Sequence, residues 1–123
     1  MKYLILIYHN QKVREAWEGL SEAERAKGMK AYAAFMEDLI ESGELVVGEA
    51  LSDPSQAKRV SMGDGRTTTT DGPFAEVKEY LAGFYLLECE SVDRAVERAA
   101  RIPEAAFGVV EVRPVLTLGG QEM

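Results

Sequence analysis

Short apolar runs and helical apolar stripes alternate along the chain and predict a β-α-β unit in its first half. Lys2 to Tyr8 is rich in aromatic and β-branched residues between polar flanks, which is typical of a strand buried on both faces. From Ser21 onward, apolar residues recur every three or four positions. This spacing predicts an amphipathic helix that begins at a capping box of Ser21 and Glu24 and ends near Gly43. Leu45 to Leu51 follows as a second strand.

The second half repeats this order after an inserted hairpin. Gly63-Asp64-Gly65 separates residues 58–62 from the threonine-rich residues 66–70, and its Asp-Gly pair favours a tight turn in an exposed arm. Residues 82–90 form the next strand. A helix then begins at Ser91 and Asp93, and we expect its inward face to carry Val92, Val96, Ala99 and Ala100. Residues 109–118 close the chain as a strand whose Pro114 predicts an edge position or a bulge.

These elements predict a ferredoxin-like α+β fold, β-α-β-β-α-β with an inserted hairpin, in a single domain over residues 1–123. Two helices cover only one face of such a sheet, yet the strands do not alternate apolar with polar residues. In the first strand, Tyr3, Ile5 and Ile7 point one way, and apolar side chains also point the other way, namely Leu4, Leu6 and Tyr8. We therefore expect a second copy of the chain to cover the open face, as a homodimer. The alternative is a monomer whose arm or Trp17 segment folds over that face.

Charge and cysteine content narrow the class of partner. The net charge of −7 and the sequence pI near 4.8 disfavour nucleic acid and anionic lipid surfaces. The single cysteine, Cys89, excludes an internal disulfide framework and is typical of a reducing compartment, so we expect a cytoplasmic protein. No apolar run approaches transmembrane length, and no membrane association is predicted.

Residues 70–79 read Thr-Asp-Gly-Pro-Phe-Ala-Glu-Val-Lys-Glu and resemble the signature of the DGPF proteins, a branch of the YCII-related family. Five further segments resemble that family in the same order: residues 1–8, 48–51, 83–86, 99–103 and 110–114. The resemblance spans nearly the whole chain and implies a dimeric α+β barrel. It also implies that some relatives are lyase-like enzymes with a His and an Asp at the site. Some DGPF proteins occur alongside extracytoplasmic-function sigma factors, which suggests a sigma-factor association.

Two residues are candidates for acid/base catalysis. Asp71 precedes Gly72 and Pro73, whose restricted backbone would hold the carboxylate rigidly, although an Asx-turn is an alternative role for it. His9, the only histidine, ends the first strand on the face of Ile7. Imidazole exchanges protons near neutral pH, and a nearby carboxylate could orient its ring; a solvent-facing histidine is the alternative.

Five residues are candidates for substrate binding: Glu49, Lys78, Tyr85, Glu111 and Arg113. Glu111 and Arg113 lie two apart in a strand, so they share a face and could bind an anionic group or fix the register of a dimer. Tyr85 could line a pocket or belong to the core, and Lys78 could be a solvated flank of the motif. One histidine with scattered carboxylates lacks the spacing of metal ligands, and no dinucleotide or phosphate loop is present. We therefore predict no metal and no cofactor.

The sequence leaves three functions open. The first is an enzyme with an unknown small organic substrate, in which His9 and Asp71 move protons in a lyase-like or isomerase-like step. The second is a non-catalytic ligand-sensing or partner-binding module, linked to sigma-factor regulation. The third is an interaction domain without a pocket.

Overall fold

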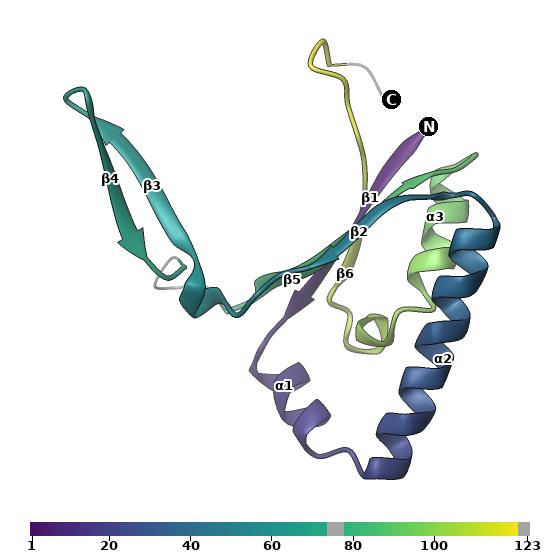
Figure 1. The fold of residues 1–123 in the computed structure, drawn as a ribbon. Coiled ribbons are helices and arrows are strands. Elements are labelled where there is room, and N and C mark those ends of the chain that lie inside the picture. The colour runs from purple at the N-terminus through teal and green to yellow at the C-terminus, as the bar shows by residue number, and fades with distance from the viewer. Residues whose placement is uncertain (74–77, 121–123) are drawn as a thin grey trace.

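A four-stranded antiparallel sheet forms the centre of the molecule (Figure 1). The computed structural model describes residues 1–73 and 78–120. Its strands are β1 (Lys2–His9), β2 (Leu45–Ala50), β5 (Tyr80–Glu88) and β6 (Val110–Pro114), in the order β2-β5-β1-β6. With the inserted hairpin set aside, this is the strand order of a ferredoxin-like β-α-β-β-α-β fold, so the predicted fold class is confirmed. Strand β6 lies at an edge of the sheet, as Pro114 predicted. At an edge, the missing amide hydrogen of proline is tolerated because one side of the strand has no partner strand.

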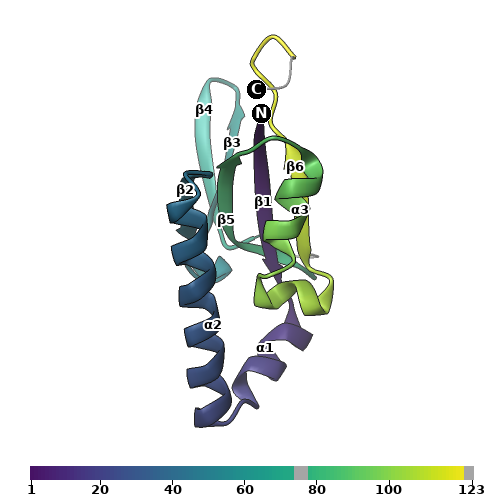
Figure 2. The same ribbon diagram turned by 90° about the vertical axis from the view of Figure 1, so that its right-hand side faces the viewer.

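The three α-helices of the described residues lie on one side of this sheet (Figures 1 and 2). They are α1 (Gln11–Glu18), α2 (Glu22–Glu41) and α3 (Val92–Ala99), accompanied by two 3₁₀ turns, η1 (Pro54–Gln56) and η2 (Pro103–Phe107). The capping box predicted for α2 is present, with the Glu24 amide bound to Ser21 Oγ at 3.1 Å and the Ser21 amide bound to Glu24 Oε1 at 3.0 Å. Gly43, at φ +76°, follows the end of the helix as predicted. No helix in the described ranges combines the length and apolar character needed to cross a membrane.

The hydrophobic core lies between the helices and the sheet. Strand residues with side chains on the helix side pack against Phe35 and Leu39 of α2 and against the end of α3, which gives a cluster of Ile5, Ile7, Phe35, Leu39, Tyr85, Leu87, Ala99 and Ile102.

 
Each of these residues is at least nine-tenths buried, with Ala99 contributing the close contact of α3. The antiparallel pairing places the end of β1, the start of β6 and the chain between α3 and β6 at one end of the core.

The inward face of α3 differs from the predicted one. Val92 and Val96 are about half exposed and Ala100 is exposed, whereas the buried residues of the helix are Ala95, Arg98 and Ala99. Small alanines let the helix approach the sheet closely. The Arg98 side chain is buried because its charge is paired with Glu44, at 2.7 Å.

The opposite face of the sheet carries apolar side chains, as the two-sided strands predicted. Cross-strand pairs place Leu4 opposite Leu86 and Leu6 opposite Phe84, with Tyr8 further along β1. Because facing residues in an antiparallel pair share one side of the sheet, these side chains lie together on that face, where Leu6 is buried and the others are half-buried. No helix in the described parts of the chain covers it (Figure 1).

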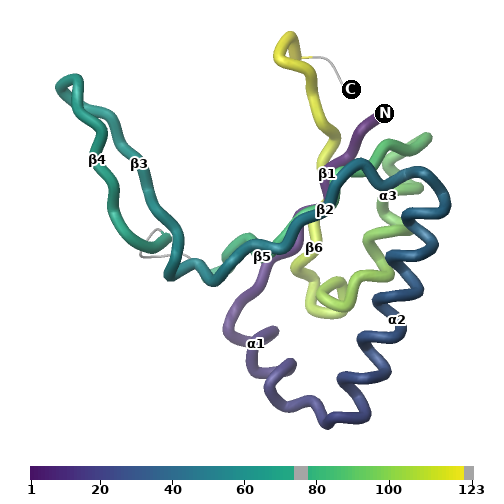
Figure 3. The backbone as a smooth tube through the Cα atoms, in the orientation of Figure 1, coloured from purple at the N-terminus to yellow at the C-terminus, as the bar shows by residue number. Residues whose placement is uncertain are grey.

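The inserted hairpin consists of β3 (Lys58–Gly63) and β4 (Arg66–Asp71). Its turn has positive φ at Asp64 (+50°) and Gly65 (+73°), as the Asp-Gly pair predicted. The hairpin projects as an arm on the side of the sheet away from the helices (Figure 3). Nearly all of its residues are exposed, including Val60 and Met62.

Candidate functional site

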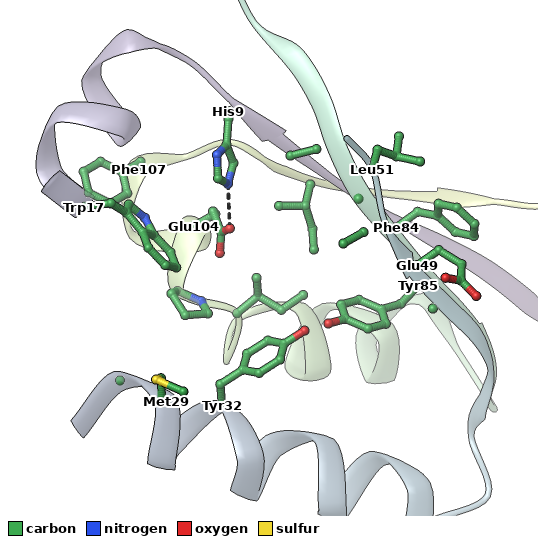
Figure 4. A pocket seen from close by; sticks show the side chains of 18 of the residues that line it. His9, Trp17, Met29, Tyr32, Glu49, Leu51, Phe84, Tyr85, Glu104 and Phe107 are labelled. Atoms are coloured by element: carbon green, nitrogen blue, oxygen red, sulfur yellow. Dashed lines mark hydrogen bonds and ion pairs between the residues drawn. The ribbon is translucent and has the colours of Figure 1, made fainter. Parts of the chain in front are cut away.

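A cavity of about 1180 Å³ lies on the helix side of the sheet, beside the end of β1. Its walls come from α1, the N-terminal half of α2, strands β2 and β5, and the turn η2 (Figure 4). The length of α2 explains this space. A helix of 20 residues extends about 30 Å, and only its C-terminal half packs into the core through Phe35 and Leu39. The N-terminal half stands off the sheet and leaves the cavity between them.

The cavity lining is mainly apolar and aromatic. Its large side chains are Trp17, Met29, Tyr32, Met36, Tyr85 and Phe107. A concave, mostly apolar surface with a few polar groups is typical of a site for a small organic molecule.

His9 and Glu104 form the main polar pair of this cavity. His9 Nε2 lies 2.8 Å from Glu104 Oε2, and the dashed line in Figure 4 marks this contact. Glu104 is only 9% exposed, so its carboxylate depends on the imidazole for a hydrogen-bond donor. A carboxylate held against an imidazole can orient the ring and can accept and return a proton with it.

Local backbone structure brings the two residues together. Strand β6 pairs with β1 so that Val110 lies opposite Ile7, and the Tyr8 amide donates to the Val109 carbonyl at 2.9 Å. The chain just before β6 therefore lies beside the end of β1. There, buried Ile102 anchors η2, and Glu104, which follows Pro103 in that turn, is directed toward His9.

Aromatic rings flank the imidazole on two sides. The ring centroid of Trp17 lies 6.2 Å from that of His9, and the centroid of Tyr80 lies 6.1 Å away. Arg14 of α1 donates to the Tyr80 hydroxyl at 2.6 Å and to Asp53 Oδ2 at 3.1 Å. These contacts hold α1, and with it Trp17, against the sheet beside the cavity.

Two groups near the core have shifted pKa values. Burial, and then the negative charge of Glu104, raise the pKa of Tyr32, so its phenol stays neutral at physiological pH. Burial likewise raises the pKa of the Cys89 thiol, which keeps the sulfur protonated and poorly nucleophilic.

Asp71 lies outside this cavity, at the end of β4. Its carboxylate pairs with Lys58 Nζ across the hairpin, and its side chain is 79% exposed. Gly72 follows at φ +83°, and its amide donates to the Ala57 carbonyl at 2.7 Å. Within the described chain, the structure does not bring Asp71 and His9 into one pocket. The motif residues 74–77 lie outside the described residues.

The five predicted substrate-binding residues are spread over the molecule. Glu49 and Tyr85 both line the cavity, and the Tyr85 ring points into it, whereas the Glu49 side chain points away from it, beside Phe84 (Figure 4). Glu111 and Arg113 are exposed on β6, opposite Leu6 and Leu4, and therefore lie on the open face of the sheet. Lys78 is exposed. Of the five, only Tyr85 presents its side chain to the cavity.

Sequence reasoning missed Glu104, Trp17 and Tyr32 as site residues. Glu104 could have been found from the topology, since the start of the last strand must lie beside the end of the first in this fold. Trp17 and Tyr32 carried no such signal, because apolar stripes usually indicate core packing. Among the described residues, no three His, Cys, Asp or Glu side chains gather closely enough to hold a metal ion.

Comparison with known proteins identifies the family. Residues 1–118 match the sequence profile of the YCII-related domain. The chain belongs to the YCII-related family. It is 36% identical to an uncharacterised protein of Rhizobium meliloti (strain 1021) over 117 residues. This alignment covers 94% of this chain and 92% of the relative.

The chain is also similar to a solved structure. That structure is the 5-chloro-2-hydroxyhydroquinone dehydrochlorinase of Burkholderia phenoliruptrix AC1100, in complex with 2,5-dihydroxybenzoquinone. The match has a TM-score of 0.49 and 19% sequence identity, and it covers 98% of this chain and 100% of the other.

Proposed function

We propose that this chain is a small-molecule enzyme that moves a proton in a lyase-like or isomerase-like step, with His9 and Glu104 as its acid/base pair. The observation that carries the proposal is the buried Glu104 carboxylate, bound to the only histidine inside an aromatic-lined cavity. Buried carboxylates are costly unless they are paired, and such pairs are common at sites of proton transfer.

The cavity lining favours a substrate with an apolar ring. Trp17 and Phe107 offer flat apolar surfaces near the imidazole. The substrate we propose is therefore a cyclic or aromatic molecule with an acidic C–H bond. The pair would remove that proton and return it to the same or a neighbouring atom.

Deuterium exchange tests this proposal without knowledge of the natural substrate. Aromatic and cyclic ketones, with acetophenone first, are incubated with the protein in D₂O, and loss of the α-proton signal is followed by ¹H NMR. We expect the wild type to accelerate exchange. His9→Gln and Glu104→Gln should each lower the catalysed rate by about a hundredfold or more, because positioned acid/base groups contribute rate factors of that order.

Glutamine keeps hydrogen-bonding capacity at both positions, so the variants should fold with melting temperatures close to that of the wild type. Glu18→Gln, an exposed change on α1, is the matched control and should leave exchange unchanged. Exchange that proceeds equally in all three variants would exclude the His9–Glu104 pair as the acid/base group.

Asp71 enters the same assay as a separate catalytic candidate. Its exposed position beside Lys58 favours a role in the hairpin, so we expect Asp71→Asn to keep most of the exchange activity. A loss of activity comparable to that of His9→Gln would instead support the role predicted for Asp71, with its carboxylate reaching the site of another copy.

A ligand-sensing module is the alternative function, and the same cavity would serve it. Under that function, ketones or other ring compounds would raise the melting temperature by mass action, but no exchange or product would appear. A link to sigma-factor regulation would then be tested by co-purification with and without the stabilising compound.

We also propose that two copies pair through the open face of the sheet. The half-buried apolar side chains of Leu4, Phe84 and Leu86 on that face support this, as does the arm that extends from the same side. An isolated two-stranded hairpin is at best marginally stable in water, so packing against a second copy would stabilise it.

A further inference from the structure

Two tyrosine hydroxyls enter the cavity from opposite walls. Tyr32 comes from α2 and Tyr85 from β5, and Figure 4 shows their hydroxyls pointing toward one another. Tyr85 is only 6% exposed. Within residues 1–73 and 78–120, neither hydroxyl forms a hydrogen bond with another residue. This observation is strongest for Tyr85, because buried tyrosines usually find a partner for the hydroxyl, and one aimed into a cavity indicates a ligand contact. Tyr32 is 36% exposed, and its hydroxyl is available to the same ligand.

Neighbouring residues fix both rings in place. The Phe35 ring packs against both, with its centroid 6.0 Å from that of Tyr32 and 6.2 Å from that of Tyr85. Gly48 pairs with Tyr85 across β2 and β5, and a Cβ at that position would overlap the Tyr85 ring. The absence of a side chain at Gly48 therefore lets the Tyr85 ring lie across β2.

Such a pair is suited to a single acceptor oxygen. A neutral phenol donates one hydrogen bond, and a carbonyl oxygen has two lone pairs that accept two. The raised pKa of Tyr32 keeps that phenol in its donor form. In an apolar cavity, two donors aimed at one oxygen also stabilise negative charge that develops there, as in an oxyanion hole.

We infer that Tyr32 and Tyr85 together bind a carbonyl oxygen of the substrate, across the cavity from His9 and Glu104. This inference rests on the proposed function and adds the substrate class, a neutral ring compound with a carbonyl group. Carboxylates and phosphates fit less well, because Glu104 and the net charge of −7 repel anions.

The step that this arrangement supports is enolisation. The His9–Glu104 pair takes a proton from the carbon beside the carbonyl group. The C–H electron pair forms a C=C bond, and the carbonyl π pair moves to oxygen, where the two phenols hold the negative charge. Return of the proton to carbon restores the ketone, so atoms and electrons balance without a further reactant.

Binding of acetophenone and of ethylbenzene, which lacks the oxygen, tests the inference. NMR titrations compare the wild type with Tyr32→Phe, Tyr85→Phe and the double variant. We expect each single change to weaken acetophenone binding by about threefold to tenfold, since a neutral hydrogen bond contributes about that much. Ethylbenzene should bind equally to all four proteins. Tyr8→Phe, on the open face of the sheet, is the matched control and should change neither affinity.

Infrared spectroscopy adds a direct readout of the hydrogen bonds. The carbonyl stretch of bound acetophenone should shift to lower frequency in the wild type and return toward its value in apolar solvent in the double variant. If the double variant does not fold, Tyr32→Phe alone gives the same test, because Tyr32 lies at the edge of the core.

The outcomes separate this inference from the proposed function. Equal affinities and equal stretching frequencies in wild type and variants would overturn the tyrosine pair, as would no binding of acetophenone at millimolar concentration. Exchange that depends on His9 would still support the proposed function in that case. Conversely, tyrosine-dependent binding without His9-dependent exchange would support the tyrosine pair and contradict the proposed enzymatic function.

Discussion

The orientation of the Tyr85 ring depends on the absence of a side chain at Gly48. Gly48 faces Tyr85 across the β2–β5 ladder, and the ring occupies the space that a Cβ would need. Strand glycines are usually unfavourable, because they add backbone entropy to the unfolded state and pack no side chain. At this position the close approach of an aromatic ring explains the residue.

We therefore predict that Gly48→Ala destabilises the protein although alanine is the better strand residue. Displacing the ring from its contact with Phe35 should cost about 1–3 kcal/mol of unfolding free energy, measured by urea denaturation. Acetophenone binding should weaken as well, because the Tyr85 hydroxyl moves.

Gly63→Ala provides the matched control for this change. Gly63 lies in a strand with an open space around its Cβ position, so the substitution should be nearly neutral. In a Tyr85→Leu background, Gly48→Ala should lose most of its cost. A full cost in that background would show that the ring is not the cause.

The histidine of the site could be predicted from the sequence, but its carboxylate partner could not. His9 is the only imidazole and ends a recognisable strand. Glu104 lies 95 positions away in the chain, in a short 3₁₀ turn without strong periodicity. Asp71 was a candidate because Gly72 and Pro73 follow it. A rigid turn accounts for that pattern whether or not the carboxylate belongs to a site. Local patterns identify residue types, whereas a pair distant in sequence depends on the register of β1 and β6.

At the scale of elements, a partly buried charge network connects α3 to the start of β2. Glu44 accepts from Arg94 Nε at 3.0 Å and from Arg98 Nε at 2.9 Å. This network explains why the inward face of α3 differs from the predicted one. The apolar pattern of the helix favoured Val92 and Val96, but pairing with Glu44 allows Arg98 to be buried instead.

The network predicts a pH-dependent contribution to stability. Although partial burial acts to raise the pKa of Glu44, hydrogen bonds from Arg94, Arg98 and Ser42 lower it overall. A carboxyl group with a lowered folded-state pKa stabilises the fold above its unfolded pKa of about 4.3, and this contribution is lost as pH falls through the folded value.

Glu44→Gln should accordingly lower the free energy of unfolding by about 1–3 kcal/mol at pH 7, because Arg98 loses its charged partner. Urea denaturation at a series of pH values should show the difference from wild type shrinking below about pH 4. Glu97→Gln, at the exposed partner of Arg94, should have little effect at any pH. A difference that stays constant down to pH 2 would contradict the assignment to the Glu44 carboxylate.

At the scale of the whole molecule, the order of elements was readable because each boundary has a local signal. The capping box at Ser21, the glycine at position 43 and the Asp64-Gly65 turn all occur where the sequence indicated them. The cavity was not readable, since it results from the mismatch between a long α2 and a short sheet. The two-sided apolar strands of β1 and β5 were equally visible in the sequence, and they lead to the last prediction.

Pairing through the open face predicts that a charge at its centre separates the copies while each subunit stays folded. The variant that tests this is Leu4→Glu. Leu4 lies on that face opposite Arg113, which would supply a counter-charge to the new glutamate in the separated subunit. In a sheet-to-sheet dimer, the same glutamate would be buried against a second apolar surface, at a large desolvation cost. Light scattering coupled to size exclusion at micromolar concentration should report two copies for the wild type and one for Leu4→Glu. Val92→Glu, at an exposed apolar residue on the helix side, should remain paired. A wild type that is a single folded subunit at this concentration would exclude the dimer, and the apolar face of the sheet would then need another partner.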